Sequence, residues 1–401
     1  MDSGNTAWII TSTALVLFMT LPGLALFYAG LVRAQNVLSV LMHCLGIACV
    51  SSIAWLVIAY SLAFSGSGAY VGDLGNLMLA NLTRDSMSGD IPESVFFMFQ
   101  MTFAIITPAL IVGAFAERIK FSFVMVFSLL WVILIYAPIV HWIWGGGWLA
   151  ELGVTDFAGG LVVHLTAGVT ALVIASFLGS RDGFPDNVQP PHNPSLTMMG
   201  ACMLWVGWFG FNGGSALAAN GDAGMAILVT HISAATATLV WMLIEKIKFG
   251  KASLVGAVTG CIAGLASITP ASGSVGPLGA LMIGLIAGAI CYYMVNVIKD
   301  LLKIDDSLDV FAVHGVGGLI GILAIPFLTA TAWGGVGYGD GNFSSLMYAQ
   351  IIGVISVFLF TLIGSIILLV ITRSLCGLRV SEEAVEEGLD IAEHGQSGYK
   401  L

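Results

Sequence analysis

The stretch DFAGGLVVH, residues 156–164, holds two polar residues inside a long apolar run. Asp156 and His164 bracket only small or apolar residues, and DSLDVFAVH at residues 306–314 repeats that spacing with Asp306 and His314. Polar groups are costly to bury in hydrocarbon, and ionisable residues found there tend to mark a substrate path. The two histidines are therefore candidate functional residues, and their position depends on how the rest of the chain is arranged.

The composition predicts a polytopic membrane protein. Of the 401 residues, 58% are hydrophobic and 9% are charged, with a mean hydropathy of +0.98. In a soluble domain about a quarter of the residues are charged. The six cysteines are scattered without metal-ligand spacing, so we expect no disulfide framework, metal or cofactor. We expect neither a soluble enzyme nor a partner of nucleic acid.

Apolar runs long enough to span a membrane occur throughout the chain, since about 20 residues cross a hydrocarbon core roughly 30 Å thick. They predict an all-α membrane protein with eleven transmembrane helices, of which the sixth and eighth are short and rich in glycine. The predicted spans are 6–32, 37–64, 93–116, 121–142, 157–179, 195–214, 222–244, 252–270, 277–298, 309–328 and 346–375.

The basic residues predict the orientation. With the N-terminus outside, all but one of the 13 Lys and Arg residues fall on the inner side, and only Arg84 falls outside. Cytoplasmic loops carry such an excess of Lys and Arg. We therefore expect a multi-pass protein of the plasma (inner) membrane with its N-terminus outside and its C-terminus in the cytoplasm. No cleavable signal peptide is expected, because the first basic residue, Arg33, follows the first apolar run.

Three pairs of segments repeat along the chain. FYAGLVRAQN (27–36) resembles FNGGSALAAN (211–220), ITPA occurs at 106–109 and at 268–271, and the two Asp–His stretches form the third pair. Each pair joins a predicted helix to the fifth helix after it, so the partners should run in opposite directions. This pattern predicts an inverted repeat of five plus five helices, a plan typical of transporters whose sites lie near the membrane midplane.

The repeat also predicts the division of the chain. A transmembrane domain covers residues 1–376, followed by a cytoplasmic tail at 377–401 that is rich in acidic residues. Within the domain, the boundaries are about 6–179 for repeat A, about 195–328 for repeat B and about 346–375 for the last helix.

The repeat brings the two histidines together. If Asp156 and Asp306 cap their helices at opposite membrane faces, each histidine lies about 12 Å deep, at 1.5 Å per residue. In a core roughly 30 Å thick, that leaves about 6 Å between them in depth. Two neutral imidazoles can share one N–H···N bond and still bind a small solute or pass a proton. A bare metal ion does not fit, because no third ligand lies within reach.

The remaining histidines have simpler interpretations. A single histidine in an apolar helix is more often a packing residue, which is our expectation for His43 and His231. His141, His192 and His394 lie near span ends or in loops, where histidine is unremarkable.

Aromatic residues gather near the outer ends of the helices, in HWIWGGGW (141–148), FQMTFAIITPA (99–109) and WFGFNGGSA (208–216). Aromatic belts occur at most membrane interfaces, which accounts for Trp142 and Trp148. The hydroxyl of Ser215 beside several aromatic residues is more specific. An aromatic cage with one acceptor would hold a small cation by cation–π attraction.

At this point the sequence resembles the ammonium transporter family (Amt/Mep/Rh), and within it the prokaryotic Amt branch. The resemblance covers nearly the whole chain from about Asn5. It is carried by PGLALFYAGLVRAQNVLS, DFAGGLVVH, WFGFNGGSALAAN, ITPASG, DDSLDVFAVHGVGGL and GLRVSEEAVEEGLDIAEHG. The resemblance implies a homotrimer with one pore per subunit, ammonium as the substrate and methylammonium as its analogue. It also implies a regulatory tail that contacts PII-type signal proteins.

The resemblance also implies roles for single residues. Asp156 would support ammonium binding or deprotonation, and Phe103 and Phe211 would form a stacked gate. The outer recognition site would comprise Phe99, Phe103, Trp144 and Ser215, and the pore would be lined by His164, His314, Trp208, Thr269 and Phe27.

Together these expectations describe a transporter that binds NH4+ outside, removes a proton, and passes NH3 by the twin histidines, with the proton relayed separately. Two alternatives remain. The chain could be an ammonium sensor that signals through a cytoplasmic partner, or a membrane redox protein with haem held between His164 and His314.

Overall fold

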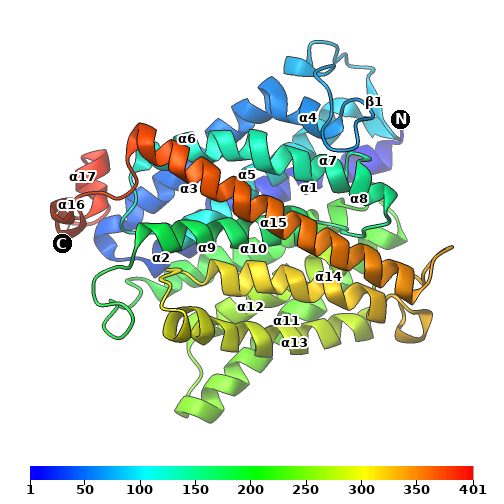
Figure 1. The fold of residues 1–401 in the computed structure, drawn as a ribbon. Coiled ribbons are helices and arrows are strands. Elements are labelled where there is room, and N and C mark those ends of the chain that lie inside the picture. Colours follow the sequence, from blue (N-terminus) through cyan, green and yellow to red (C-terminus); the bar gives the residue numbers. More distant parts are fainter. Residues whose placement is uncertain (401) are drawn as a thin grey trace.

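Long helices lying side by side make up most of the molecule (Figure 1). The structure, a computed structural model, describes residues 1–400. In the first half the elements are α1 (Ser3–Phe18), η1 (Met19–Leu24), α2 (Ala25–Leu31), η2 (Ala34–Asn36), α3 (Val37–Ala54), η3 (Trp55–Ala59), α4 (Tyr60–Phe64), η4 (Leu77–Leu79), β1 (Met87–Ser88), β2 (Ile91–Pro92), α5 (Glu93–Phe115), α6 (Phe121–Trp131), η5 (Val132–Tyr136), α7 (Ala137–Ile143), α8 (Trp148–Glu151), η6 (Gly160–Leu165) and α9 (Thr166–Leu178).

The second half continues the same pattern and ends in two short helices. Its elements are α10 (Pro194–Gly214), α11 (Gly221–Phe249), α12 (Leu254–Ile268), η7 (Thr269–Ala271), α13 (Pro277–Asn296), η8 (Val297–Leu301), η9 (Phe311–Gly315), α14 (Val316–Leu328), η10 (Thr331–Trp333), α15 (Phe343–Cys376), α16 (Glu382–Glu387) and α17 (Leu389–His394). The two strands pair as one small antiparallel hairpin.

Ten helical segments within the described residues are long and apolar enough to cross a membrane. They match ten of the eleven predicted spans. The remaining prediction, at 195–214, corresponds to α10, which has 21 residues and five glycines along its length. It is long enough to span a hydrocarbon core, but its composition is less apolar than that of the other ten. The all-α membrane architecture is therefore confirmed.

The bundle has two ends, which we name by the chain termini. The N-face carries the N-terminus, the hairpin, α8 and the loop before α15, whereas the C-face carries the loop after α9 and the tail helices α16 and α17 (Figure 1). Helix α9 ends at the C-face, where Gly179 O accepts a hydrogen bond from Arg118 Nε. Helix α14 runs the other way and ends at the N-face (Figure 1). The opposite directions predicted for the two Asp–His helices are confirmed.

Glycines allow these two helices to touch at the backbone. A Cβ on Gly168 would lie 2.5 Å from Gly315 Cα, and a Cβ on Gly318 would lie 2.6 Å from Gly160 O. No side chain fits at either contact, because real Cβ atoms do not approach other atoms so closely. Small residues at helix contacts allow this close packing in membrane proteins. The crossing of η6–α9 with η9–α14 thus fixes where His164 and His314 lie.

The tail packs against the C-face. Leu389 is fully buried, its backbone N–H donates to Asn36 Oδ1 at 2.9 Å, and Asp390 Oδ1 accepts from Ser39 N at 2.8 Å. Asp390 therefore sits close to the first turn of α3, where a carboxylate is favoured by the helix dipole. Leu389 and Asp390 are therefore packed against the bundle and do not belong to an unstructured, solvated tail.

Candidate functional site

The two Asp–His stretches meet at the centre of the molecule. His164 Nδ1 and His314 Nδ1 are 3.2 Å apart, and the ring centroids are 5.2 Å apart with an interplanar angle of 21°. The side chains are 1% and 4% exposed. Both lie on π-helical turns, η6 and η9, at the start of their helices. The predicted meeting of His164 and His314 is confirmed.

The shared contact constrains the protonation of the pair. When both rings are neutral, one Nδ1 carries a proton and donates to the lone pair of the other. The donor ring then has an unprotonated Nε2, and the acceptor ring has an Nε2–H group. His164 Nε2 has no hydrogen-bond partner among the described residues. The pair can therefore accept a hydrogen bond at one end and donate one at the other.

The aspartates hold the two helix starts unequally. Asp156 Oδ1 accepts from Gly159 N at 2.9 Å and Gly160 N at 2.6 Å, while Oδ2 accepts from Leu161 N at 2.7 Å and Val162 N at 3.1 Å. All four are N–H groups that a helix start leaves without intrahelical partners. Asp306 Oδ2 accepts one such bond, from Phe311 N at 2.7 Å. Both predicted caps are confirmed, and the cap at Asp156 is the more complete one.

A small, almost wholly apolar cavity of about 10 Å³ surrounds the histidine pair. This is close to the space that one water molecule needs. Its lining residues are Met19, Leu24, Phe27, Ile106, Leu110, Val163, His164, Leu204, Trp208, Phe211, Ile262 and His314. A haem between the histidines is excluded by this geometry, because a macrocycle cannot enter a one-water cavity or fit into a 3.2 Å gap. No cluster of three metal-ligating side chains occurs in residues 1–400.

Trp208 and Thr269 are joined by a hydrogen bond beside His164. The Trp208 ring stacks on His164, with centroids 5.6 Å apart, and its Nε1–H donates to Thr269 Oγ1 at 2.7 Å. Thr269 in turn donates to Leu265 O at 2.8 Å. Trp208 and Phe27 line the cavity as expected, whereas Thr269 is not among its lining residues and reaches it only through Trp208.

An aromatic vestibule of about 300 Å³ opens at the N-face. It brings together all four residues predicted for the recognition site, and Phe103 meets Trp144 edge-on at 5.8 Å between centroids. Ser215 Oγ donates to Phe211 O at 2.8 Å, which leaves its lone pairs as acceptors. The full lining is Phe64, Phe96, Phe99, Gln100, Phe103, Ile143, Trp144, Phe157, Ser215 and Leu217.

Two phenyl rings separate this vestibule from the central cavity. Phe103 lines the vestibule and Phe211 lines the cavity, and their centroids are 4.3 Å apart at 33°. The Phe211 centroid lies 6.2 Å from that of His164. Both rings are at most 1% exposed. A solute that moves from the vestibule to the histidines must pass this closed pair.

Asp156 lies behind the vestibule. It is 5% exposed and is not a lining residue, but its backbone carbonyl accepts the Trp144 Nε1–H at 2.8 Å. Its carboxylate is occupied by the four backbone N–H groups. Its geometry is that of a residue that positions both Trp144 and the helix of His164.

The sequence missed six vestibule residues: Phe64, Phe96, Gln100, Ile143, Phe157 and Leu217. Gln100 lies within the quoted segment FQMTFAIITPA, between Phe99 and Phe103. Its place between two predicted recognition residues was the only signal in the sequence, because a glutamine in an apolar helix has no spacing pattern of its own.

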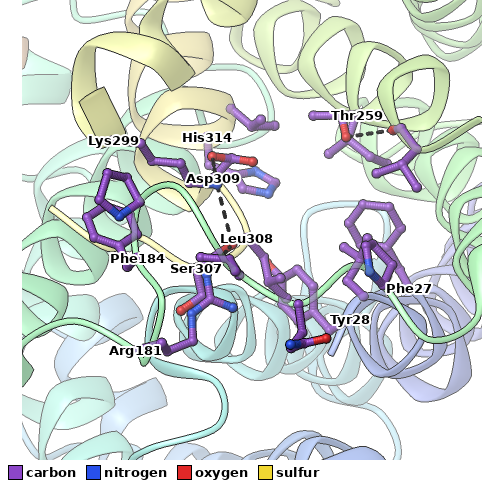
Figure 2. A pocket seen from close by; sticks show the side chains of 18 residues that line it. Phe27, Tyr28, Arg181, Phe184, Thr259, Lys299, Ser307, Leu308, Asp309 and His314 are labelled. Carbon is purple, nitrogen blue, oxygen red and sulfur yellow. Dashed lines mark hydrogen bonds and ion pairs between the residues drawn. The ribbon is translucent and has the colours of Figure 1, made fainter. Parts of the chain in front are cut away.

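On the opposite side of the pair, a pocket of about 250 Å³ leads from His314 towards the C-face (Figure 2). Phe27 and Tyr28 form one wall and the loop with Ser307, Leu308 and Asp309 forms another (Figure 2). This pocket carries charge, since Asp309 Oδ1 pairs with Lys299 Nζ at 2.6 Å. Aromatic vestibule, phenyl pair, histidine pair and charged pocket therefore follow one another through the bundle.

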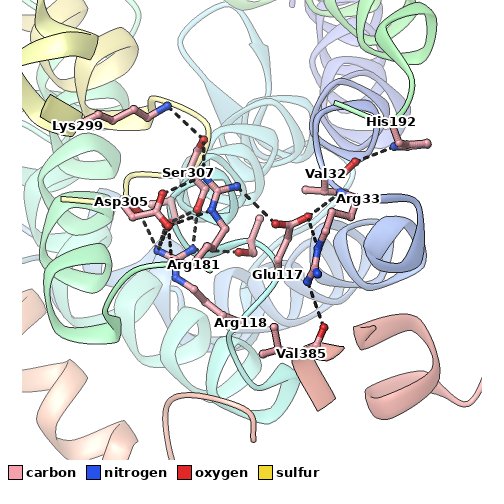
Figure 3. Close-up of polar contacts among 12 residues, drawn as sticks. Val32, Arg33, Glu117, Arg118, Arg181, His192, Lys299, Asp305, Ser307 and Val385 are labelled. Atoms are coloured by element: carbon pink, nitrogen blue, oxygen red, sulfur yellow. Dashed lines mark hydrogen bonds and ion pairs between the residues drawn. The ribbon is translucent and has the colours of Figure 1, made fainter. Parts of the chain in front are cut away.

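Buried ion pairs stabilise the loop that precedes His314 in the chain (Figure 3). Arg118 is fully buried and donates to Ser307 Oγ at 2.6 Å and Asp305 O at 2.7 Å. Arg181 binds the Asp305 carboxylate with two nitrogens, at 3.0 and 2.9 Å. Burial raises the pKa of the Asp305 carboxyl, but the hydrogen bonds and charge of Arg181 outweigh it, so this pKa lies below its ordinary value.

The same network reaches the tail. Glu117 contacts Arg181 at 3.5 Å and Arg33 at 3.4 Å, and Arg33 Nη2 donates to Val385 O at 3.2 Å (Figure 3). These contacts join the tail to the loop that supports Asp306 and His314.

Three of the other histidines lie as expected from their positions. His43 packs between Phe115 and Phe121. His231 lies against Trp205. His141 contacts the carbonyl oxygens of Ala63 and Gly68 near its helix end.

Comparison with known proteins gives one consistent result. The family model described as the Ammonium Transporter Family matches residues 7–399. The chain is 44% identical to a putative ammonium transporter of Methanothermobacter thermautotrophicus, over all of this chain and 99% of that protein. It is 42% identical to an ammonium transporter of Bacillus subtilis, with the same coverage.

Solved structures agree in fold. A structure titled Sensor Amt Protein superposes with a TM-score of 0.90 at 32% identity and covers 98% of both chains. Saccharomyces cerevisiae Mep2 superposes with a TM-score of 0.86 at 35% identity, covering 96% of this chain and 90% of that one.

Proposed function

The chain belongs to the ammonium transporter family, and from this premise we propose that it takes up ammonium by binding NH4+ in the N-face vestibule and passing NH3 along the histidine pair. The observation that carries this proposal is the sequence of three environments: an aromatic vestibule with a hydroxyl acceptor, a closed phenyl pair, and a one-water apolar cavity with two imidazoles.

The charge of the substrate is the main physical difficulty. Moving an ion into an apolar cavity that holds about one water carries a large desolvation cost. Ammonium is a weak acid, and the loss of one proton removes most of that cost. The cavity walls offer imidazole nitrogens but no counter-charge. This supports passage of neutral NH3, which accepts a hydrogen bond from one imidazole and donates to the other.

The vestibule suits the charged form. The faces of Phe and Trp rings attract a small cation, most strongly where it is partly desolvated. Ser215 adds an acceptor directed by its own bond to Phe211 O. We assign recognition to Phe99, Phe103, Trp144 and Ser215, the gate to Phe103 and Phe211, and the pore lining to His164, His314, Trp208 and Phe27. Thr269 accepts the hydrogen bond of the Trp208 indole and holds that ring in place. Asp156 positions the Trp144 indole and the first turn of η6.

The proton takes its own route in this proposal. Because the histidines share an Nδ1···Nδ1 contact of 3.2 Å, a proton can pass from one ring to the other along an existing hydrogen bond. Net charge then crosses the membrane although the ammonia is neutral.

We place the N-face outside and the C-face in the cytoplasm of a cell whose plasma membrane holds the protein. The support is the distribution of basic residues: Arg33, Arg118 and Arg181 lie at the C-face, whereas Arg84 lies in the loop before α5. Such an excess of positive charge favours the cytoplasmic side.

Assembly and regulation follow from the family in the same proposal. The transmembrane domain forms a homotrimer with a pore in each subunit, and the tail is a cytoplasmic regulatory segment that receives a PII-type signal protein. The support is the tail's position at the C-face, where Arg33 joins Val385 to the network around the C-face pocket.

A sensing role is the second candidate, because the Sensor Amt Protein structure is similar over 98% of the chain. A pure sensor would bind ammonium without moving it.

Reconstitution in proteoliposomes tests the proposal. Addition of ammonium should give a saturable inward current. His164→Ala should abolish or strongly reduce the current, and Ser215→Leu should raise the concentration for half-maximal rate. Wild-type activity in both variants would reject the assignment of the path. Saturable ammonium binding without uptake by the wild type would instead support the sensing role.

A further inference from the structure

The vestibule contains a polar side chain that the preceding assignments leave without a role. Gln100 lies on α5 between Phe99 and Phe103 and lines the vestibule. It is 8% exposed, and its Oε1 is buried without a hydrogen-bond partner. Within residues 1–400, no hydrogen bond joins either end of its amide to another residue.

An unpartnered buried amide destabilises a fold, and native proteins satisfy nearly all such groups. An apolar residue would fill this position of α5 at lower cost. Neighbouring polar groups in the same wall are all engaged: Trp144 Nε1 donates to Asp156 O, and Ser215 Oγ donates to Phe211 O. Gln100 therefore differs from them in having no internal contact that explains it.

The chemistry of ammonium supplies the missing partner. NH4+ has four N–H donors and no lone pair, so it can bind only to acceptors and aromatic faces. Ser215 Oγ provides one acceptor because its own hydrogen is committed to Phe211 O. The Trp144 indole provides a face but no acceptor. Gln100 is the second residue of the lining whose side chain carries a strong acceptor, and it comes from a different helix.

We propose that Gln100 is a substrate-binding residue whose amide oxygen accepts a second hydrogen bond from NH4+ in the vestibule. This inference rests on the proposed function of that vestibule. The two ends of a planar amide have nearly the same shape, so rotation about the last side-chain bond exchanges oxygen and nitrogen. No hydrogen bond holds the amide in one of the two orientations. Acceptors on α5 and at the end of α10 then bind two different N–H groups of one ammonium ion.

Replacement of Gln100 should weaken the binding of ammonium in the vestibule and leave the later steps of transport unchanged. The phenyl pair and the histidines are formed by other residues, so loss of Gln100 removes an interaction made before the ion loses its proton. Loss of such an interaction raises the half-saturating concentration and leaves the maximal rate nearly constant. One hydrogen bond to a charged group corresponds to about a 10-fold change or more in affinity.

The test uses Gln100→Leu, Gln100→Glu and the control Met101→Leu in the full-length protein in proteoliposomes. Gln100→Leu should raise the half-saturating ammonium concentration about 10-fold, with a maximal rate within about twofold of wild type. Gln100→Glu keeps acceptor oxygens at the same reach and should bind ammonium at least as tightly as wild type. Met101→Leu, a buried neighbour outside the lining, should match wild type.

Two results would overturn the inference. The first is an unchanged half-saturating concentration in Gln100→Leu, as expected if a water satisfies the amide. The second is an equal rise in Gln100→Leu and Gln100→Glu, which would indicate a packing effect. Each variant should give the same size-exclusion profile as wild type, which excludes misfolding as the cause of a change in affinity.

Failure of the transport proposal can be distinguished from failure of this inference. If wild type transports and Ser215→Leu weakens its affinity while Gln100→Leu does not, only the role of Gln100 falls. If wild type moves no ammonium, the thermal stabilisation of purified protein by ammonium still reports binding. In that case Gln100→Leu should need about 10-fold more ammonium for the same stabilisation, and equal stabilisation of both proteins would reject the inference.

Discussion

Replacement of Asp156 by asparagine tests how the central histidine is held in place. The carboxylate accepts four backbone N–H groups, two on each oxygen. An asparagine keeps one oxygen and turns an NH2 group towards the other two N–H donors. Two charge-assisted bonds are lost, each worth about 1.5–3 kcal/mol, so the expected destabilisation is about 3–6 kcal/mol. Repulsion between donors adds to that loss.

The matched control is Asp306→Asn. Asp306 accepts one backbone bond, from Phe311 N, and a suitably rotated asparagine oxygen can still accept it. The expected cost is therefore well below that at Asp156, although both residues are at least 95% buried and lie eight residues before a histidine. The equal Asp–His spacing makes the two positions equivalent in sequence, whereas the number of hydrogen bonds makes them unequal in energy.

The assay is unfolding of both purified variants in detergent, followed by ammonium-driven current in proteoliposomes. Asp156→Asn should unfold at a clearly lower denaturant concentration than Asp306→Asn, and its current should fall because the first turn of η6 no longer fixes His164. Equal unfolding midpoints for the two variants would refute this account of the cap. A stable Asp156→Asn protein without current would show that the charge of Asp156 acts on the substrate instead.

Three further perturbations give separate outcomes. Gly168→Ala should destabilise the protein by about 1–3 kcal/mol, because the new Cβ would lie 2.5 Å from Gly315 Cα; Gly224→Ala, which meets nothing within 4 Å and lies inside α11, should not lower the unfolding midpoint. Phe211→Ala removes one ring of the closed pair and opens the cavity behind it to water, so the selectivity of the current for ammonium over K⁺ should fall; unchanged selectivity would contradict the gate. The pKa of Asp305 is lowered when folded, so its contribution is complete above about pH 4, near the unfolded pKa, and is lost as pH falls through the lower folded pKa. Thermal midpoints should therefore show no loss from this pair between pH 7 and pH 5, and Asp305→Asn should lower the midpoint throughout that range.

The sequence was sufficient to predict the central histidine pair because two rules combined. Alternating spans assign a direction to each helix, and equal Asp–His spacing from opposite faces gives equal depth. The structure brings the two Nδ1 atoms to 3.2 Å. The recognition residues Phe99, Phe103, Trp144 and Ser215 followed from family motifs, and the vestibule lining contains all four.

Other features could not be read from the sequence. Gln100 is a site candidate only because its amide lacks a partner, and that absence becomes visible only when every neighbouring side chain is in place. The contacts of the tail depend on residues about 350 positions away, as in the bond between Ser39 N and Asp390 Oδ1. Composition alone favours an unstructured acidic segment, whereas the burial of Leu389 and Asp390 gives it a fixed position.

The contact between the two rings has a consequence for the proton. The helices η6–α9 and η9–α14 approach from opposite faces and bring the two Nδ1 atoms to 3.2 Å from each other. One shared hydrogen cannot be symmetric: one ring must donate it and the other must accept it. When a proton binds the bare Nε2 of the donor ring and the acceptor ring releases its Nε2 hydrogen, transfer of the shared hydrogen reverses both tautomers and exchanges the accepting and donating ends of the pair. The next proton can follow in the same direction only after both rings return to the first arrangement, and ammonia hydrogen-bonded to the outer nitrogens can restore it. On the proposed route, passage of the proton is coupled to passage of ammonia through the tautomers of the pair, and a replacement of either histidine by a residue without two ring nitrogens should uncouple them.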